Sequence, residues 1–494
     1  MSQNLIFVAI FLPMLVGFAV ILSPLKNRKV IIAIAETVTV VTAILAWILI
    51  LNPPASEAVL FKFVGRYTIS FKVDGLSRVF AGLISSLWPF AVLYSAEYME
   101  HEASEKTLKE KTFFGTYVIT YGVTLAIALA DNMLAMYVFY EMLTLVTVPL
   151  ILFNMSDEAI SATRKYIVYS LGGAAFAFIG IIFLMSYGSS FEFVLGGVIN
   201  PANLRGRDEV LRLIYVFAFF GFGVKAAIFP LNSWLPKAGV APTPVTALLH
   251  AVAVVKSGAF AIIRLIYYSF GADFLRGTWA QYVTMGFAIF TIVYGCSMAV
   301  KERHIKRRLA YSTISNLSYI LFSATLMTPL GLSGALTHMV FHGVMKIGAF
   351  FCAGAVITKA HKTFVYELEG IGKRMPLTFF VFTVSSLSLM GVPGLCGFFS
   401  KWQIARAGVD SGTTLGLVGV GAILISAILT AIYMLQIILR AYYPLEDVEL
   451  ETGKCDPTWR MLVPLFVFTA GVVLFGVFNA PLIEFFENVA GGLI

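Results

Sequence analysis

Runs of about 20 apolar residues recur along the whole chain and constrain its fold more than any other feature. Each run can cross a hydrocarbon core roughly 30 Å thick as a helix. Apolar residues make up 59% of the 494 residues and charged residues only 13%. A transmembrane barrel would instead show short segments of alternating hydrophobicity. We therefore predict an all-α polytopic membrane protein, with an uncleaved first span because no basic stretch precedes Leu5.

The apolar runs predict about 14 transmembrane helices, with no soluble domain between them. Between spans two and three, residues 59–73 alternate polar and apolar side chains around Gly65, as an outer β-hairpin would. Residues 191–208 are expected to form a short outer loop or a surface helix. The predicted spans are 5–22, 29–51, 75–97, 112–130, 132–153, 163–187, 209–230, 243–270, 279–300, 309–328, 332–357, 376–400, 413–439 and 461–480.

The basic residues indicate topology and not a nucleic-acid partner, although the net charge is +8. About 21 of the 35 Lys and Arg fall in odd-numbered inter-helix loops and about 9 in even-numbered loops. This bias predicts a multi-pass protein of the inner (cytoplasmic) membrane with both termini outside. The cysteines are far apart and form no CxxC motif, so we expect neither a metal site nor a redox cofactor. They are Cys296, Cys352, Cys396 and Cys455.

Prolines break two of the predicted spans. Span seven meets Pro230, with Pro236 following, and span twelve meets Pro393 and Gly394. Irregular backbone at membrane depth is tolerated only where protein or water covers it. The two spans are five apart and run in opposite directions, which predicts two inverted five-helix repeats, spans 4–8 and spans 9–13. The chain then divides into spans one to three with the outer hairpin (1–111), the first inverted repeat (112–270), the second (271–440), and a C-terminal loop with span fourteen (441–494).

Five charged residues lie at membrane depth in long apolar stretches, where a charge at the middle of a bilayer costs about 3 kcal/mol. They are Glu141, Lys225, Lys256, Lys346 and Lys401. One carboxylate cannot neutralise four ammonium groups, and burial favours the neutral form of lysine. We therefore expect some of these lysines to be neutral and able to accept a proton. The alternative is a lysine that reaches an interface or pairs with helix-end carbonyls. Reaching an interface is implausible for Lys256 and Lys346, near span centres, and stays open for Lys401.

Two histidines and a lysine form a polar stripe on span eleven. His338, His342 and Lys346 are four residues apart, so they share one helix face along about 12 Å. We interpret the stripe as a proton relay, because histidine titrates near neutral pH. No carboxylate or cysteine is placed to complete a metal site there. His250 lies six residues before Lys256, and on a continuous helix these two would not share a face, although one water-linked path could include both.

The residues around the first break resemble a known family signature. Residues 223–251 read Gly-Val-Lys-Ala-Ala-Ile-Phe-Pro-Leu-Asn-Ser-Trp-Leu-Pro-Lys-Ala-Gly-Val-Ala-Pro-Thr-Pro-Val-Thr-Ala-Leu-Leu-His-Ala. This stretch closely resembles the antiporter-like subunits of respiratory complex I, membrane-bound hydrogenases and Mrp-type cation/proton antiporters. Residues 140–145, 307–315 and 338–346 fit the same pattern, and the resemblance covers roughly residues 60–440.

The resemblance implies a role for each charged residue inside the spans. Glu141 would pair with Lys225 as a switchable ion pair, and Lys401 would end an outward half-channel. The polar axis along the membrane midplane would contain Lys256, His250, His338, His342 and Lys346. The implied partners are other membrane subunits of a multisubunit complex, and the implied cargo is protons, with Na⁺ or K⁺ as the counter-ion in an antiporter.

Two departures from the family pattern narrow the expected subtype. The chain ends about 14 residues after span fourteen, without the long lateral helix of the largest complex I member or the extensions of the large Mrp subunit. Lys401 stands where one complex I member has a glutamate. We therefore expect a D-type Mrp subunit or its counterpart in a membrane-bound hydrogenase or related oxidoreductase.

The expected function is proton translocation, with sodium/proton or potassium/proton antiport as one form of it. The chain shows no redox site, so electron transfer would belong to partner subunits. The alternative is a secondary transporter of an organic solute, which also predicts inverted repeats and broken helices. That alternative does not predict lysines spread over several helices.

Overall fold

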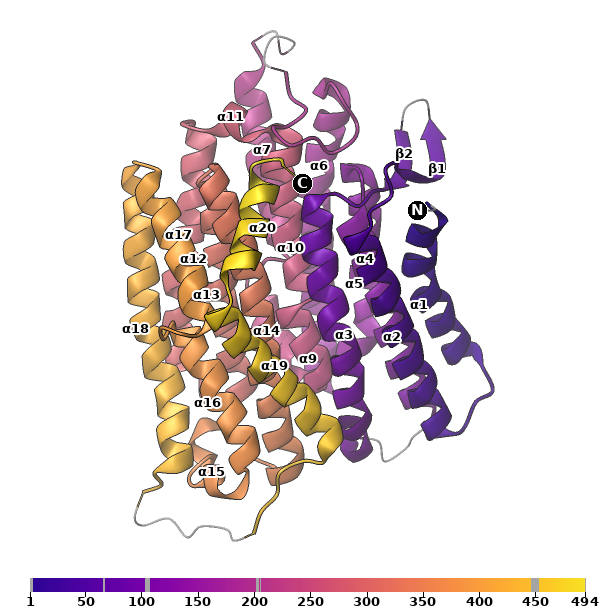
Figure 1. The fold of residues 1–494 in the computed structure, drawn as a ribbon, viewed down its shortest axis with the longest axis vertical. Coiled ribbons are helices and arrows are strands. Elements are labelled where there is room, and N and C mark those ends of the chain that lie inside the picture. Colours follow the sequence, from indigo (N-terminus) through magenta and orange to yellow (C-terminus); the bar gives the residue numbers. More distant parts are fainter. Residues whose placement is uncertain are drawn as a thin grey trace.

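The protein is a bundle of long helices that run along one common direction (Figure 1). The computed structural model describes residues 3–64, 67–102, 107–200, 204, 206–445 and 453–493. In these ranges, 11 helical segments are long and apolar enough to cross a membrane, which confirms the predicted all-α polytopic class. They are α1 (Asn4–Leu22), α2 (Arg28–Leu51), α3 (Gly75–Glu102), α4 (Thr107–Leu129), α5 (Met133–Ile151), α6 (Asp157–Tyr187), the composite span Thr243–Phe270, α12 (Trp279–Lys301), α14 (Pro329–Ala360), α18 (Thr414–Tyr442) and α19 (Trp459–Val477).

Shorter or more polar helices complete the bundle. The segments α7, α13, α16 and α17 lie among the long helices (Figure 1), and the total of 14 spans stays a prediction. The C-terminal helix α20 was not predicted from the sequence. These elements are α7 (Asp208–Gly223), α8 (Trp234–Lys237), η2 (Ala238–Val240), α9 (Thr243–Ala251), α10 (Val254–Ile263), the π-helix η3 (Arg264–Phe270), α11 (Ala272–Leu275), α13 (Ile305–Thr325), η4 (Val365–Glu367), α15 (Ile371–Arg374), α16 (Pro376–Met390), α17 (Cys396–Asp410) and α20 (Ala480–Ala490).

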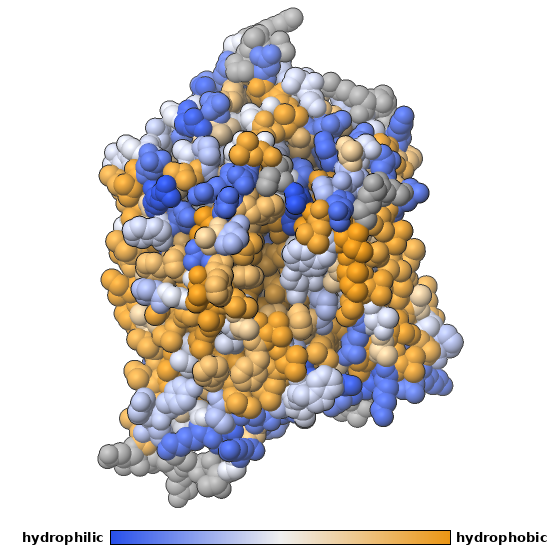
Figure 2. Space-filling view, in the orientation of Figure 1, coloured by the Kyte–Doolittle hydropathy of each residue, from blue (hydrophilic) through white to orange (hydrophobic). Residues whose placement is uncertain are grey.

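An apolar belt surrounds the middle of the bundle. Figure 2 shows hydrophobic residues across the central band of one face and hydrophilic residues gathered at its two ends. Large apolar side chains are exposed on outer helices, for example Leu15 on α1, Val168 on α6 and Leu424 on α18, which are 62–68% exposed. A soluble protein rarely exposes so much contiguous apolar surface. These side chains therefore face lipid or partner membrane subunits.

The predicted hairpin is present at one end of the bundle. Strands β1 (Ala58–Val64) and β2 (Tyr67–Phe71) pair antiparallel, and the turn at 65–66 lies outside the described residues. The backbone of β2 is joined to the turn between α4 and α5, since the Asp131 amide donates to the Ser70 carbonyl at 3.0 Å. The amide of Phe193 in turn donates to the Asp131 carbonyl at 2.8 Å. Three loops predicted on one side of the membrane thus lie together, and both chain ends lie toward the same end (Figure 1).

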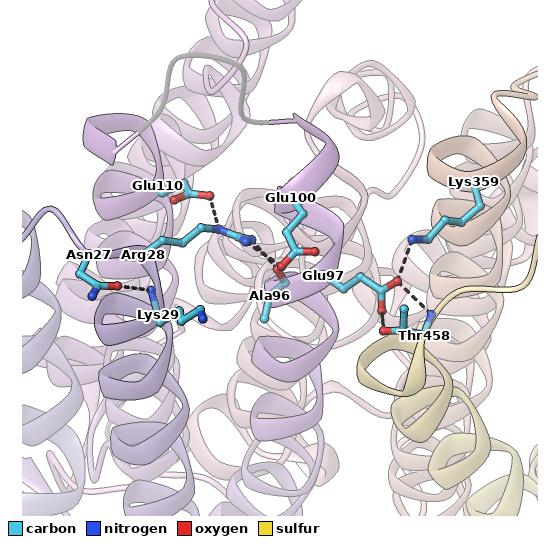
Figure 3. A network of polar contacts seen from close by, with 9 residues as sticks. All are labelled: Asn27, Arg28, Lys29, Ala96, Glu97, Glu100, Glu110, Lys359 and Thr458. Atoms are coloured by element: carbon cyan, nitrogen blue, oxygen red, sulfur yellow. Dashed lines mark hydrogen bonds and ion pairs between the residues drawn. The ribbon is translucent and has the colours of Figure 1, made fainter.

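Ion pairs tie the helices together at the end of the bundle opposite the hairpin (Figure 3). The guanidinium of Arg28 on α2 donates to Glu110 on α4 and to Glu100 on α3, both at 2.7 Å. The carboxylate of Glu97, also on α3, accepts from Lys359 on α14 at 2.8 Å and from the Thr458 amide before α19 at 2.9 Å. These contacts fix helices that are far apart in the sequence.

Glycines let α1 and α4 approach closely. A Cβ atom added at Gly17 would lie 2.5 Å from the Gly115 carbonyl oxygen, and one at Gly115 would lie 2.8 Å from the Gly17 oxygen. Membrane helices gain van der Waals contact when small residues bring their backbones together. The first span is therefore held against the bundle by this glycine pair.

We expect Gly115→Leu to destabilise the protein, because its side chain has no space between α1 and α4. Overpacking of this kind costs about 1–3 kcal/mol. Thermal unfolding of the purified protein measures the loss. The matched control is Gly172→Leu on α6, where an added Cβ meets nothing within 4 Å. An equal melting temperature for Gly115→Leu and Gly172→Leu would contradict the proposed packing.

Candidate functional site

The first predicted ion pair forms at the first helix break. The helix α7 ends at Gly223, seven residues before the proline at which the sequence predicted the break, so Lys225 lies in irregular backbone. Its Nζ is 3.7 Å from Oε1 of Glu141 on α5 and donates a hydrogen bond to the Tyr140 carbonyl. The same ammonium lies 3.3 Å from the centroid of the Tyr140 ring. Because Oε1 of Glu141 has no hydrogen-bond partner in the described part of the chain, the pair is a loose one.

Buried contacts hold the broken segment in place. The Val224 carbonyl accepts from the indole nitrogen of Trp234 at 2.8 Å. Ala227 has a φ of 55°, in the left-handed region that costs a non-glycine residue energy and marks a constrained backbone. On the neighbouring α10, a Cβ at Gly258 would lie 2.5 Å from the Ala226 nitrogen. The backbone that carries Lys225 is therefore in direct contact with the helix that carries Lys256.

A further break, which the sequence analysis did not predict, divides span eight. The helix α9 ends at Ala251 and α10 begins at Val254. His250 lies in the last turn of α9 and Lys256 in the first turns of α10, and both are fully buried. The prediction that the two residues occupy different faces of one continuous helix is therefore wrong, because no continuous helix joins them. Neither ring nitrogen of His250 has a hydrogen-bond partner among the described residues.

The two histidines of α14 contact each other and a lysine from another helix. The Nζ of Lys256 is 2.9 Å from Nδ1 of His342. The rings of His342 and His338 are nearly parallel, with centroids 5.7 Å apart. Sequence spacing alone pointed to Lys346 as the partner on the same helix. The structure instead gives His342 a lysine from α10, a contact between helices that periodicity could not reveal.

Lys346 occupies a different part of the same region. Its Nζ is fully buried and has no hydrogen-bond partner within the described ranges. It lies 5.9 Å from the centroid of the Phe350 ring, and the His250 ring is 5.0 Å from that same ring. Phe350 thus contacts both Lys346 and His250, so the two polar groups border one apolar side chain.

Lys401 lies beyond the second break and beside the histidines. Between α16 and α17, Gly391 and Gly394 have positive φ angles of 95° and 88°. The Nζ of Lys401 donates to the last carbonyls of α16, at 2.7 Å to Leu389 and 3.0 Å to Met390. These are orphan carbonyls at the negative end of a helix dipole, which favours a cation. Lys401 thus pairs with helix-end carbonyls, whereas the alternative left open for it, reaching an interface, stays untested.

Two residues that the sequence analysis missed connect Lys401 to the histidines. The neighbouring Ser400 has its Oγ 2.9 Å from Nδ1 of His338. The Tyr319 ring on α13 lies 5.2 Å from the His338 ring and 5.6 Å from the Lys401 ammonium. A serine or tyrosine in an apolar helix gives no signal in one sequence, because most such residues bond their own backbone. These contacts arrange Lys256, His342, His338, Ser400 with Tyr319, and Lys401 as a series of neighbouring polar groups.

A hydroxyl network leads away from this series and was also missed. The Tyr319 hydroxyl donates to Oγ of Ser426 on α18 at 2.7 Å, and Ser426 lies 3.1 Å from Oγ of Ser315. Cys296 contacts the same serine at 2.8 Å, as a small buried thiol. Further along, the Tyr433 hydroxyl donates to Ser312 at 2.7 Å. Buried hydroxyl groups of this kind can pass protons between fixed positions.

The fold and the site define a polytopic membrane protein with titratable groups along its interior. Residues 130–429 match the family described as NADH:quinone oxidoreductase/Mrp antiporter, TM, and the chain belongs to that family. It is 29% identical to NADH-quinone oxidoreductase subunit N of Desulforudis audaxviator over 84% of this chain and 83% of the relative. It is 32% identical to NADH-quinone oxidoreductase subunit L of Mycobacterium tuberculosis over 75% of this chain and 57% of that longer protein.

Solved structures show the same fold at low sequence identity. A chain of the Mrp complex from Dietzia sp. superposes with a TM-score of 0.86 at 19% identity, covering 100% of this chain and 98% of the other. A chain of an archaeal membrane-bound sulfane sulfur reductase gives 0.84 at 22% identity, covering 99% and 97%. A chain of respiratory complex I from Thermus thermophilus gives 0.80 at 20% identity, covering 99% and 98%. All three belong to multisubunit membrane complexes.

We expect Lys401→Met to loosen the second break, because it leaves the Leu389 and Met390 carbonyls without their donor. A hydrogen bond to a charged group contributes about 1.5–3 kcal/mol. Hydrogen exchange of the peptide that covers residues 391–396 should therefore be faster in the variant. Lys401→Arg, which keeps a cationic donor, serves as the control and should exchange more slowly than Lys401→Met. Unchanged exchange in Lys401→Met would show that the lysine does not hold this backbone.

Proposed function

We propose that the chain is a proton-translocating membrane subunit of a multisubunit complex in the inner (cytoplasmic) membrane, with both termini outside. The observation that carries this proposal is the buried series from Lys256 through His342 and His338 to Lys401. Groups of this type are costly in a membrane and mark ion or proton pathways. A carrier of an organic solute would need a cavity shaped for that solute, and the two histidines and two lysines offer proton donors and acceptors instead.

The first step we propose is a proton transfer between Lys256 and His342. When the lysine is an ammonium, its Nζ–H points along a 2.9 Å contact to Nδ1 of the neutral imidazole. Transfer leaves a neutral amine and an imidazolium, and the N–H···N geometry is within the range for direct exchange. The ring of His338 lies nearly parallel to the ring of His342. His342 can pass the charge to His338 once a ring rotation or a water molecule supplies a hydrogen bond between the two rings.

The second step we propose moves the charge from His338 to Lys401. The Oγ of Ser400 lies at Nδ1 of His338 and also 3.1 Å from the Gly397 carbonyl, to which it can donate. When the hydroxyl donates to that carbonyl, its oxygen can only accept from His338. Nδ1 of His338 therefore carries the hydrogen, and Nε2 is the atom free to accept a proton. Lys401 then takes the proton beside the second break, from which it leaves toward the side that holds the hairpin.

The Glu141–Lys225 pair is proposed to control this series electrostatically. A closed pair is nearly neutral, whereas an opened pair leaves the Lys225 charge uncompensated beside α10, which contacts the 225–226 backbone through Gly258. A like charge at short range in a low dielectric disfavours protonation of its neighbour. Opening the pair would therefore push the proton on Lys256 toward His342, and closing it would allow Lys256 to reload.

The complex that holds this subunit is proposed from its relatives. The fold fits an Mrp-type antiporter, a membrane-bound oxidoreductase such as the archaeal sulfane sulfur reductase, or complex I. In an antiporter, sodium or potassium movement would drive the proton series. In an oxidoreductase, electron transfer in partner subunits would drive it. In the proposed inverted repeats, the break between α7 and α8 matches the break between α16 and α17. A lysine of the proposed mechanism lies at each of these breaks.

Glu141→Gln should abolish proton-coupled transport while the protein still assembles, because the uncharged amide cannot form or open an ion pair with Lys225. Transport is measured as proton flux in inverted membrane vesicles, together with the amount of assembled complex. Glu158→Gln, an exposed acid in the first turn of α6, is the control and should transport normally. Wild-type flux in the Glu141→Gln variant would remove the ion pair from the mechanism.

Lys256→Arg should lower the transport rate by about 100-fold or more, which is the usual range for losing a positioned acid–base group. Arginine keeps the charge and does not release its proton. Lys359→Arg is the matched control, since Lys359 pairs with Glu97 outside the proton series and an arginine can keep that ion pair. A Lys256→Arg variant with full activity would show that a fixed positive charge is sufficient at this position.

A further inference from the structure

Three carboxylates from separate parts of the chain converge at the hairpin end of the bundle. Glu57 lies just before β1, Asp131 lies in the turn between α4 and α5, and Glu192 lies in the loop that follows α6. One oxygen atom from each of the three lies within 4.8 Å of the other two. The residues are far apart in the sequence, so no spacing pattern could have predicted the cluster, and the sequence analysis expected no metal site.

The buried member of the cluster lacks a hydrogen-bond donor. Asp131 is 3% exposed, and its Oδ2 has no hydrogen-bond partner among the residues that the structure describes. A buried carboxylate oxygen without a donor or a cation is costly. The backbone cannot easily move it outward, because the Asp131 amide and carbonyl are bonded to Ser70 and Phe193. The carboxylate is thus held in a position where it needs a positive partner.

The nearby cations are too few to balance all three carboxylates in their ionised form. Arg264 is already engaged by Asp74, which accepts two hydrogen bonds from its guanidinium at 2.5 and 2.8 Å. Lys72 remains as the cation whose charge acts on Asp131. One ammonium cannot neutralise three carboxylates in their ionised form, and one divalent cation would supply the missing positive charge.

The donor atoms are all carboxylate oxygens, which hard divalent cations prefer. Calcium binds such oxygens at about 2.4 Å in a flexible geometry, whereas magnesium demands a near-ideal octahedron at about 2.1 Å, which three separate chain segments supply less readily. Calcium also accepts water as a ligand, and the exposed Glu192 leaves the site open to solvent.

We propose that Glu57, Asp131 and Glu192 form a calcium site that fastens the β-hairpin to the α4–α5 turn and to the loop after α6. An affinity in the range of extracellular calcium modules, with a Kd of about 10⁻⁴–10⁻³ M, suits a partly exposed site with three protein carboxylates. The site stands apart from the proton series, so the proposal does not depend on the proposed function.

Hydrogen exchange of the complex that contains this chain, with and without CaCl₂, tests the site. The peptides to follow cover residues 67–71, 130–133 and 188–199. At a calcium concentration about ten times the Kd, opening of these segments should slow about tenfold in the wild type. Asp131→Asn should abolish the slowing. Glu192→Gln, which changes an exposed residue and should fold normally, should weaken it. Glu484→Gln, an exposed acid on α20, is the control and should respond like the wild type.

Two outcomes would overturn the calcium site. One is the same exchange rate in the wild type with and without CaCl₂. The other is an equal slowing in Asp131→Asn, which would place the effect elsewhere in the complex. NaCl at matched ionic strength separates binding from charge screening, and a response to NaCl as large as the response to CaCl₂ would also reject the proposal.

Discussion

Four lysines inside the bundle, Lys225, Lys256, Lys346 and Lys401, outnumber Glu141, the carboxylate that pairs with the first of them, and this mismatch governs the interior of this protein. In a low dielectric, an ammonium needs a carboxylate, a set of carbonyl dipoles or a neutral form. Each of the four lysines has different surroundings. Lys225 has a loose carboxylate, Lys401 has two helix-end carbonyls and Lys256 has an imidazole. Lys346 has no hydrogen-bond partner in the described chain. Such unequal environments are what allow a proton to be held at one position and released at the next.

Broken helices make these environments possible. A continuous helix uses most of its carbonyls in its own hydrogen bonds, whereas a break leaves carbonyls free to accept from a buried ammonium. The end of α16 provides such carbonyls for Lys401, and the irregular segment after α7 brings Lys225 to the Tyr140 carbonyl. The break between α9 and α10 separates His250 from Lys256 and lets the lysine meet α14. Each break therefore brings one lysine side chain to a partner that it would not reach from an unbroken helix.

The sequence predicted the membrane class, the hairpin and both proline-marked breaks, because apolar runs, alternation and proline act locally. It did not predict the break at Val252–Ala253, where no proline or glycine stands, nor the α20 helix. Candidate site residues were found where a charge interrupts an apolar run. Their partners were not found, since Ser400 and Tyr319 look like ordinary packing residues and the Lys256–His342 contact joins two helices. Inter-helix contacts depend on how the helices pack, which one sequence without relatives does not encode in any local pattern.

The central claim is that at least one buried lysine is a neutral amine that exchanges its proton with the histidines. Solid-state NMR of the protein in lipid bilayers, with ¹⁵N-labelled lysine side chains, measures this directly, because amine and ammonium nitrogens resonate at different shifts. The account predicts a neutral-amine signal near neutral pH that disappears in Lys256→Met or Lys346→Met and persists in Lys359→Met. A spectrum in which every lysine side chain is an ammonium across the pH range of transport would contradict it.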